Sequence, residues 1–227
     1  MISRKCALLV SIGIFWATSV ASAAVLYDFE TGIPNVSNGA GFGFPGTSVA
    51  WENSGIGATS GTGSLRVTAP VDAFSWGAVI NVLADAANTA TVAAASASPS
   101  LWQLEFDVTL DPSTMPDWTN FVNGTVVLNS ETGTFDQAPE PWLFGGGDTW
   151  GTRHAVVPFS QLEDANAAPH GGGWLELGFA INGDWGDVPG SMYIDNIQLN
   201  LIPEPASLGL LGVAAVALLP VIRRRRG

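Results

Sequence analysis

Cysteine is almost absent from this chain, and its absence excludes several kinds of site. The only cysteine among the 227 residues is Cys6. Disulfides, cysteine nucleophiles and thiolate-bound zinc all require cysteine, so none of them can form beyond this position. The rest of the chain must therefore be stabilised by burial of its own apolar core, with or without a bound metal.

Positive charge is nearly missing from the middle of the chain. Lysine and arginine together number 8, against 20 aspartates and glutamates. Residues 24–202 hold nineteen of these acids and only Arg66 and Arg153, which gives a formal charge of −17. Such a surface repels phosphates, so nucleic acid is excluded as a partner and polyanionic glycans are disfavoured. Neutral polysaccharides and divalent cations remain compatible with it.

Known catalytic motifs are also missing. The chain has only 2 histidines and contains neither Gly-x-Ser-x-Gly nor His-Glu-x-x-His. Acid pairs such as Glu105/Asp107 or Glu163/Asp164 leave glycoside hydrolysis open as an alternative. However, side chains two positions apart on a strand lie only about 7 Å apart on a flat face, with no cleft implied. We therefore expect a protein that is not an enzyme.

The first 23 residues have the pattern of a signal peptide. Arg4 and Lys5 form a basic start, and an apolar run follows from Cys6 to Val20. The small residues Ala21-Ser22-Ala23 then stand where a signal peptidase cuts. This predicts export with cleavage after Ala23, and the alternative is a retained N-terminal anchor.

The last 25 residues have the pattern of a membrane-spanning tail. An apolar stretch covers residues 206–222, about 25 Å of helix, which is just enough to span a thin bilayer. The arginines after it should stay in the cytoplasm, which places residues 24–202 outside. The segment with its flanks resembles the PEP-CTERM sorting signal, carried here by Pro203, Glu204, Pro205, Arg223, Arg224, Arg225 and Arg226.

The PEP-CTERM resemblance implies processing by an exosortase, a membrane-embedded enzyme, at the cell envelope. It implies an anchored precursor in the inner membrane, and then a protein at the cell surface or in the extracellular matrix, often alongside exopolysaccharide. A plain C-terminal anchor is the alternative.

Residues 24–202 read as an all-β domain. Short alternating runs are separated by Gly, Pro, Asn and Asp, which is typical of a two-sheet antiparallel β-sandwich of jelly-roll type. Residues 31–63 are expected to form long loops, and residues 84–100 a short helix or a loose connection. The expected strands are 25–29, 64–69, 74–83, 101–110, 123–129, 153–159, 174–182 and 191–199.

Alternation assigns the two faces of the longer strands. One face of 101–110 is apolar and expected in the core, and the opposite face carries Gln103, Glu105 and Asp107. In 174–182, Trp174 and Glu176 share the polar face. If these two strands belong to one sheet, their outer faces form a single platform.

Sugar rings stack on aromatic planes, and their hydroxyls bond to acids and amides, so this platform would suit a glycan. Further tryptophans fall in expected loops, where a large exposed ring needs a reason. Packing in the core or in a loop is the alternative for each tryptophan, above all for Trp76 and Trp102. The loop tryptophans are Trp118, Trp142, Trp150 and Trp185.

Three segments in order resemble the galactose-binding-like, jelly-roll carbohydrate-binding modules. They are Tyr27 to Glu30, Ser60 to Val67 and Tyr193 to Leu199. The resemblance implies a structural calcium ion where these segments meet. Its carboxylates would come from Glu30 and Asp195, and its carbonyls from Gly61 and Gly63. The alternative is that Asp195 caps a turn and Glu30 is solvated.

Taken together, these patterns predict an exported, non-catalytic protein of the cell envelope or extracellular matrix. Its expected partner is a neutral polysaccharide, bound through tryptophans and acids. A purely structural surface protein without a small ligand is the competing hypothesis.

Overall fold

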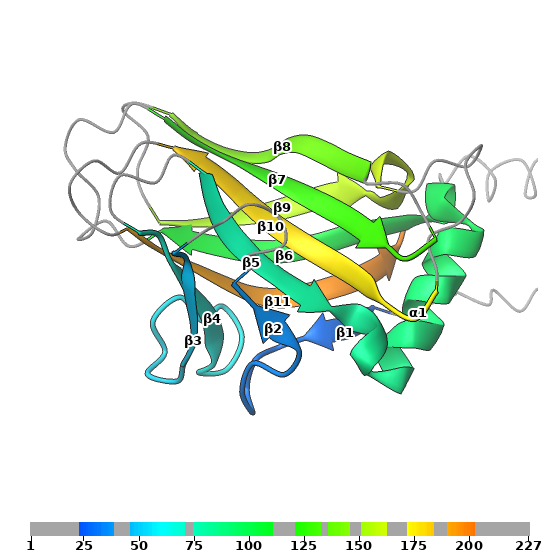
Figure 1. The fold of residues 1–227 in the computed structure, drawn as a ribbon, viewed down its shortest axis with the longest axis horizontal. Helices are drawn as coiled ribbons and strands as arrows, with labels where there is room; N and C mark the ends of the chain where they lie inside the picture. The colour runs from blue at the N-terminus through cyan, green and yellow to red at the C-terminus, as the bar shows by residue number, and fades with distance from the viewer. Residues whose placement is uncertain are drawn as a thin grey trace, which may run out of the picture.

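The fold is seen in a computed structural model, whose described residues form two antiparallel sheets and one α-helix (Figure 1). The structure describes residues 23–38, 46–70, 75–110, 121–132, 136–145, 151–162, 172–183 and 190–202. The predicted signal peptide, except its last residue, and the whole tail from residue 203 lie outside these ranges. Within them, no helix has the length and apolar character needed to cross a membrane.

Sheet A contains six strands in the order β3-β4-β11-β6-β9, and β1 also pairs with β11. All of its pairings are antiparallel. Its strands are β1 (Ala24–Tyr27), β3 (Ser48–Glu52), β4 (Ser64–Thr68), β6 (Trp102–Leu110), β9 (Thr152–Pro158) and β11 (Ser191–Leu201).

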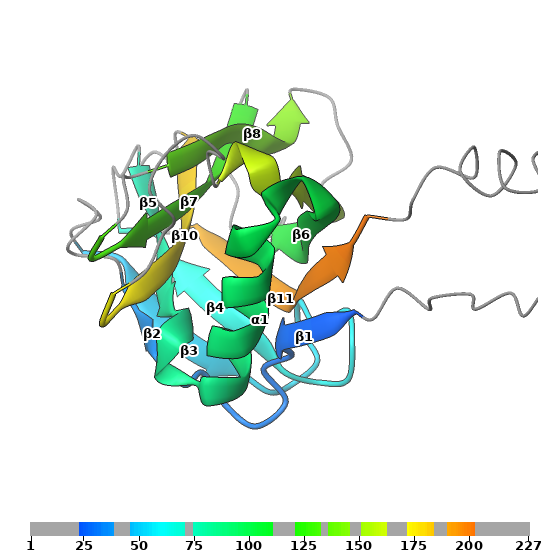
Figure 2. The same ribbon diagram turned by 90° about the vertical axis from the view of Figure 1, so that its right-hand side faces the viewer.

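Sheet B contains five strands in the order β2-β5-β10-β7-β8, again all antiparallel. It faces sheet A across the core, as Figure 2 shows from the end of the molecule. Its strands are β2 (Val36–Ser37), β5 (Ser75–Asn81), β7 (Phe121–Ser130), β8 (Asp136–Gly145) and β10 (Leu175–Gly183).

The core lies between the sheets and follows the alternation predicted from the sequence. Phe106 of β6 and Phe179 of β10 meet edge to face with ring centroids 4.9 Å apart. Both rings are fully buried, as is Trp76 of β5. Each large apolar side chain buried in this way stabilises the fold by about 1.5–3 kcal/mol. The predicted two-sheet antiparallel sandwich is confirmed.

Helix α1 (Ala86–Ala97) lies across one end of the sandwich (Figures 1 and 2). Its alanine-rich sequence favours a helix, and the Asp85 side chain caps it by accepting from two first-turn N–H groups. Val92 and Ala95 are buried against the core. Of the two predictions for residues 84–100, the short helix is therefore confirmed.

Three strands were not predicted from the sequence, namely β2, β3 and β8. The prediction that residues 31–63 form only loops is wrong, since β2 and β3 lie within them. Strand β8 contains Pro139 and Pro141, which removes two ladder donors and hides the strand signal. Such prolines are tolerated because β8 is an edge strand of sheet B, with a hydrogen-bonded neighbour on one side only.

Candidate functional site

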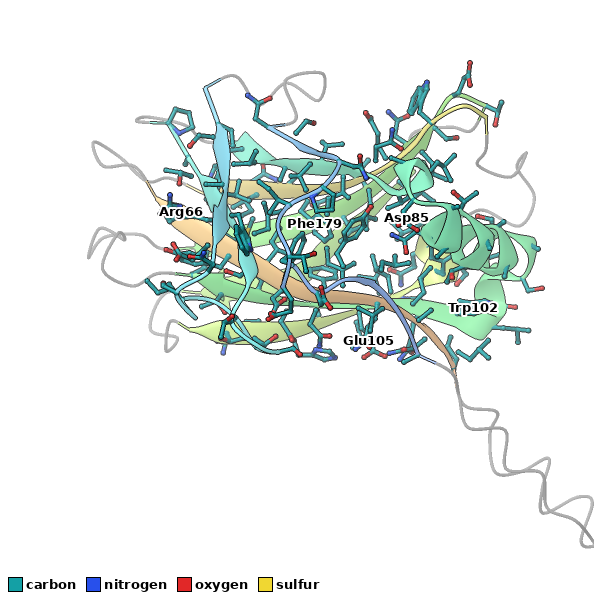
Figure 3. The ribbon with its side chains drawn as sticks, turned by 90° about the horizontal axis from the view of Figure 1, so that it is seen from below. Arg66, Asp85, Trp102, Glu105 and Phe179 are labelled. Carbon is teal, nitrogen blue, oxygen red and sulfur yellow. The ribbon has the colours of Figure 1, made fainter. Side chains whose placement is uncertain are left out.

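A row of polar side chains crosses the outer face of sheet A. Gln103, Glu105 and Asp107 project from alternate positions of β6, while the residues between them are buried in the core. The register sets His154 of β9 directly opposite Asp107. Glu105 accordingly lies at the margin of the molecule in Figure 3, whereas the core residue Phe179 lies inside it. The predicted outward orientation of the three β6 residues is confirmed.

His154 bridges two carboxylates of this row. Its Nδ1 lies 2.7 Å from Asp107 Oδ1, and its Nε2 lies 3.2 Å from Glu105 Oε2. The hydrogen bond with Asp107 raises the pKa of His154, with partial burial opposing it and both carboxylate charges adding to it. The imidazole is 48% exposed, so solvent screens part of this attraction.

Glu105 is held in its ionised form by neutral and charged partners. Burial raises its pKa, but hydrogen bonds with Asn200, Gln103 and His154 outweigh burial and leave the pKa below its ordinary value. The Gln103 amide donates to Glu105 Oε1 at 2.5 Å. The row is thus an ordered network of acceptors at neutral pH.

The row continues into the loop between β3 and β4. The Thr59 hydroxyl lies 2.5 Å from Asp107 Oδ2 and 3.1 Å from Asp195 Oδ2, so its single proton serves one carboxylate at a time. The Asn196 amide also donates to Asp107, at 3.3 Å. Asp107 is therefore a structural member of the network, and only 8% of it is exposed.

Two carboxylates hold this loop against the first and last strands, an arrangement we call the loop clasp. Asp195 of β11 is fully buried and accepts from the N–H groups of Thr59 at 2.7 Å and Ser60 at 3.0 Å. Glu30 accepts from the N–H groups of Thr62 at 3.0 Å and Gly63 at 2.8 Å. Backbone donors thus satisfy both acids directly.

The loop clasp contains the four residues for which the resemblance implied calcium. A methyl group at Gly61 would lie 2.3 Å from the Glu30 carboxylate, and Gly63 lies against the Phe29 carbonyl, so the loop closes tightly on Glu30. Asp195 reaches the same loop.

The oxygens that face the loop accept N–H and O–H donors, whereas calcium needs six to eight oxygen ligands. In the chain ranges that the structure covers, no three His, Cys, Asp or Glu side chains gather as metal ligands would. Calcium at these four residues stays a prediction.

A second polar group lies on the outer face of sheet B, and we call it the sheet B surface. Cross-strand pairing sets Asn81 of β5 and Asn129 of β7 on either side of Glu176 in β10. Trp174 lies two residues before Glu176, at the position just before β10 begins, and its carbonyl accepts from Glu131 N at 3.3 Å. The four members of the surface, Asn81, Asn129, Trp174 and Glu176, are each partly exposed.

The two polar groups do not form one platform. Strand β6 belongs to sheet A and β10 to sheet B, so their outer faces look away from each other. The predicted combination of Trp174 and Glu176 with Gln103, Glu105 and Asp107 is therefore wrong. Whether either group binds a ligand stays a prediction.

The tryptophans divide between core and surface. Trp76 is fully buried and Trp102 is partly buried against the core. For both, this agrees with the alternative prediction that they pack in the core. Trp51 is 41% exposed, and its indole N–H donates to the Phe29 carbonyl at 2.8 Å. The predicted ligand residues Trp118, Trp150 and Trp185 lie outside the described residues, as does the side chain of Trp142.

Sequence reasoning missed three residues at these sites. His154 is not among the predicted ligand residues, although alternation along β9 places it outward. Asn81 and Asn129 also occupy outward positions of their own strands. Their grouping depends on strand register, which the sequence does not display.

Comparison with known proteins identifies the fold. No family profile matches the chain, and no curated protein matches it. Among solved structures, a family 30 carbohydrate-binding module matches with a TM-score of 0.52 and 11% identity, over 81% of this chain and 90% of that one.

The CBM27-1 module of Caldicellulosiruptor saccharolyticus, solved with mannohexaose, has a TM-score of 0.51 and 13% identity, over 78% of this chain and 96% of that one. At such identity the likeness establishes the fold alone. The chain thus has the β-sandwich fold of carbohydrate-binding modules.

Proposed function

We propose that this protein binds a neutral polysaccharide without catalysis, through the sheet B surface. The observation that carries this proposal is the grouping of Trp174 and Glu176 with Asn81 and Asn129. An aromatic plane beside one carboxylate and two amides is the set of groups that a sugar ring and its hydroxyls require. The fold supports the same conclusion, because two modules that share it are carbohydrate-binding modules.

Charge supports a neutral partner. The Asp and Glu side chains in residues 24–202 repel polyanionic glycans, and Glu176 itself would oppose a uronic acid. We propose exopolysaccharide of the producing cell as the partner. The reason is that the tail resembles the PEP-CTERM sorting signal, which often accompanies exopolysaccharide.

Affinity electrophoresis tests this proposal directly. We expect gels containing a neutral mannan or xylan to retard the purified chain, and Trp174→Ala and Glu176→Gln to abolish or strongly reduce the retardation. Thr152→Ala, an exposed change on sheet A, is the matched control and should migrate as the wild type does. Equal migration in all gels would contradict binding and favour a purely structural surface protein. Release of reducing sugar would instead reveal a glycoside hydrolase.

We also propose export and exosortase processing at the envelope. The Pro203-Glu204-Pro205 motif supports this, because it follows β11, which ends at Leu201, so a cut there would leave the sandwich whole. Mass spectrometry of the chain from its native envelope should show loss of residues 1–23 and of the apolar tail. An intact chain in the cytosol would contradict the proposal.

A further inference from the structure

A separate pocket opens beside the first strand, next to the Asn81 end of the sheet B surface. Asn35, which lines the pocket, accepts from Asn81 N at 3.0 Å through its carbonyl, and the Tyr27 hydroxyl donates to the Asn81 carbonyl at 3.4 Å. The pocket lies between the segment from β1 to β2 and the start of α1, and its volume is about 190 Å³. Pockets that take drug-sized ligands are larger, about 300–1,000 Å³. The space therefore suits a single ring with its substituents rather than a stretch of polymer.

The walls of this pocket combine aromatic rings with hydrogen-bonding groups. Tyr27 and Phe29 both line it, and their rings stack with centroids 5.8 Å apart and an interplanar angle of 17°. Asn88 is buried in the wall and donates to the Leu26 carbonyl at 3.1 Å. Asn35 lies at the exposed rim. The pocket thus has a buried floor and a polar mouth.

An unusual backbone shapes the rim. Phe29 and Asn35 have φ values of 56° and 60°, and Gly32 between them has 133°. Such values are costly for residues other than glycine, about 1–2 kcal/mol each. These residues turn the chain between β1 and β2, where it lines the pocket.

The charges in the pocket select against acids. Asp28 and Asp85 line it, and no lysine or arginine is among its described lining residues. The N–H groups at the start of α1 are not available to an anion, because Asp85 Oδ1 already accepts from Ala87 N at 2.8 Å and Asn88 N at 3.1 Å. Asp85 lies beside the beginning of the helix in Figure 3. These carboxylates disfavour an anionic ligand, and the acceptors in the wall suit a ligand rich in hydroxyl donors.

We propose that this pocket is a second binding site, which takes one neutral sugar residue, such as the end of a glycan chain. Tyr27 and Phe29 are only 6% and 2% exposed, so they would form the apolar floor beneath the sugar. Recognition would rest on Asp28, Asp85 and Asn35, which would accept from the sugar hydroxyls. The inference rests on the proposed function in that both concern glycans, but it uses none of the residues of the sheet B surface.

Saturation-transfer NMR on the purified full chain tests this site with glucose, mannose, galactose and xylose, and with glucuronic acid as the charged comparison. We expect at least one neutral sugar to receive saturation and glucuronic acid to receive none. Thr31→Phe, a plug at the exposed rim, should abolish the signal. Thr152→Phe, the matched change on an exposed position of β9, should leave it unchanged.

Asp85→Asn gives a second test that keeps the helix cap, because asparagine caps as well as aspartate does. We expect it to weaken sugar binding about fivefold, since a charged acceptor bonds more strongly than an amide. Absence of saturation for every neutral sugar would overturn the site, as would a signal that survives Thr31→Phe. Glu176→Gln should leave the monosaccharide signal intact, so loss of polysaccharide retardation alone would count against the sheet B surface and not against the pocket.

Discussion

His154 contacts two carboxylates through its two ring nitrogens, so the strength of this bridge depends on the protonation of the imidazole and hence on pH. Its pKa is raised, chiefly by the hydrogen bond with Asp107. A histidine with a raised pKa stabilises the folded state fully below its ordinary value of 6.5 and loses this contribution as pH rises through the folded-state value. The bridge should therefore be strongest in mild acid, above the range in which Glu105 becomes protonated.

We expect His154→Asn to lower the melting temperature more at pH 5.5 than at pH 8.5. At pH 5.5 the wild-type imidazolium binds both carboxylates, whereas at pH 8.5 the neutral ring contributes less. Melting followed by circular dichroism at both values measures the difference, and Thr152→Ala on the same strand is the control that lacks a titrating group. A deficit that stays constant or grows with pH would contradict the bridge.

At the scale of elements, the loop between β3 and β4 lies over the outer face of sheet A. Gly57 in this loop approaches β11 so closely that an added Cβ would lie 2.2 Å from the Tyr193 Cβ, and its φ is 72°. Gly55 in the same loop has a φ of 87° but nothing within 4 Å of an added Cβ. A comparison of alanine substitutions at the two glycines therefore distinguishes the cost of backbone strain from the cost of steric overlap.

We expect Gly57→Ala to reduce the free energy of unfolding by about 3 kcal/mol, from left-handed strain plus overpacking against Tyr193. Gly55→Ala, which adds only strain, should cost about 1 kcal/mol. Urea denaturation of both variants measures these values. If the two variants were equally stable, the close packing of the loop on β11 would be refuted.

At the scale of the whole molecule, the loop clasp joins segments that are far apart in the sequence. Glu30 follows β1, the loop follows β3, and Asp195 lies in β11 near the end of the domain. In a chain whose only cysteine is Cys6, such contacts take the place that disulfide cross-links have in disulfide-bonded proteins. The clasp should therefore control global stability.

We expect Asp195→Asn to reduce the free energy of unfolding by about 3 kcal/mol. The buried carboxylate accepts from backbone N–H groups, and an amide in its place would bring N–H donors of its own to face them. Asp28→Asn, at an exposed carboxylate, is the control and should change stability little. Melting in EDTA tests the predicted calcium ion separately, and an unchanged melting temperature would remove it. A fall of several degrees in EDTA that calcium reverses would establish the predicted calcium site instead.

Much of the fold was predictable because alternation is a local property. The apolar positions of β6 and β10 fixed which side of each strand faces the core, and burial of Phe106 and Phe179 confirms it. The missed strand β8 carries two prolines, and β3 lies in a segment rich in glycine and serine, so neither has a local strand signal.

The candidate sites were less predictable, because they depend on which strands pair. Nothing in the sequence assigns β6 and β10 to different sheets, yet this decides that Glu105 and Glu176 face opposite ways. The pocket beside Tyr27 likewise forms only when α1 packs next to the segment that follows β1.

The sequence by itself determined the acidic character of the domain, the absence of thiol chemistry beyond Cys6 and the inward and outward faces of its strands. These properties follow from composition or from the order of neighbouring residues, so they do not depend on how the chain folds. Only the tertiary structure decided the sheet order, the closure of the loop clasp and the position of the pocket. Those features arise from contacts between residues distant in sequence, and their energies exist only once the sheets have packed.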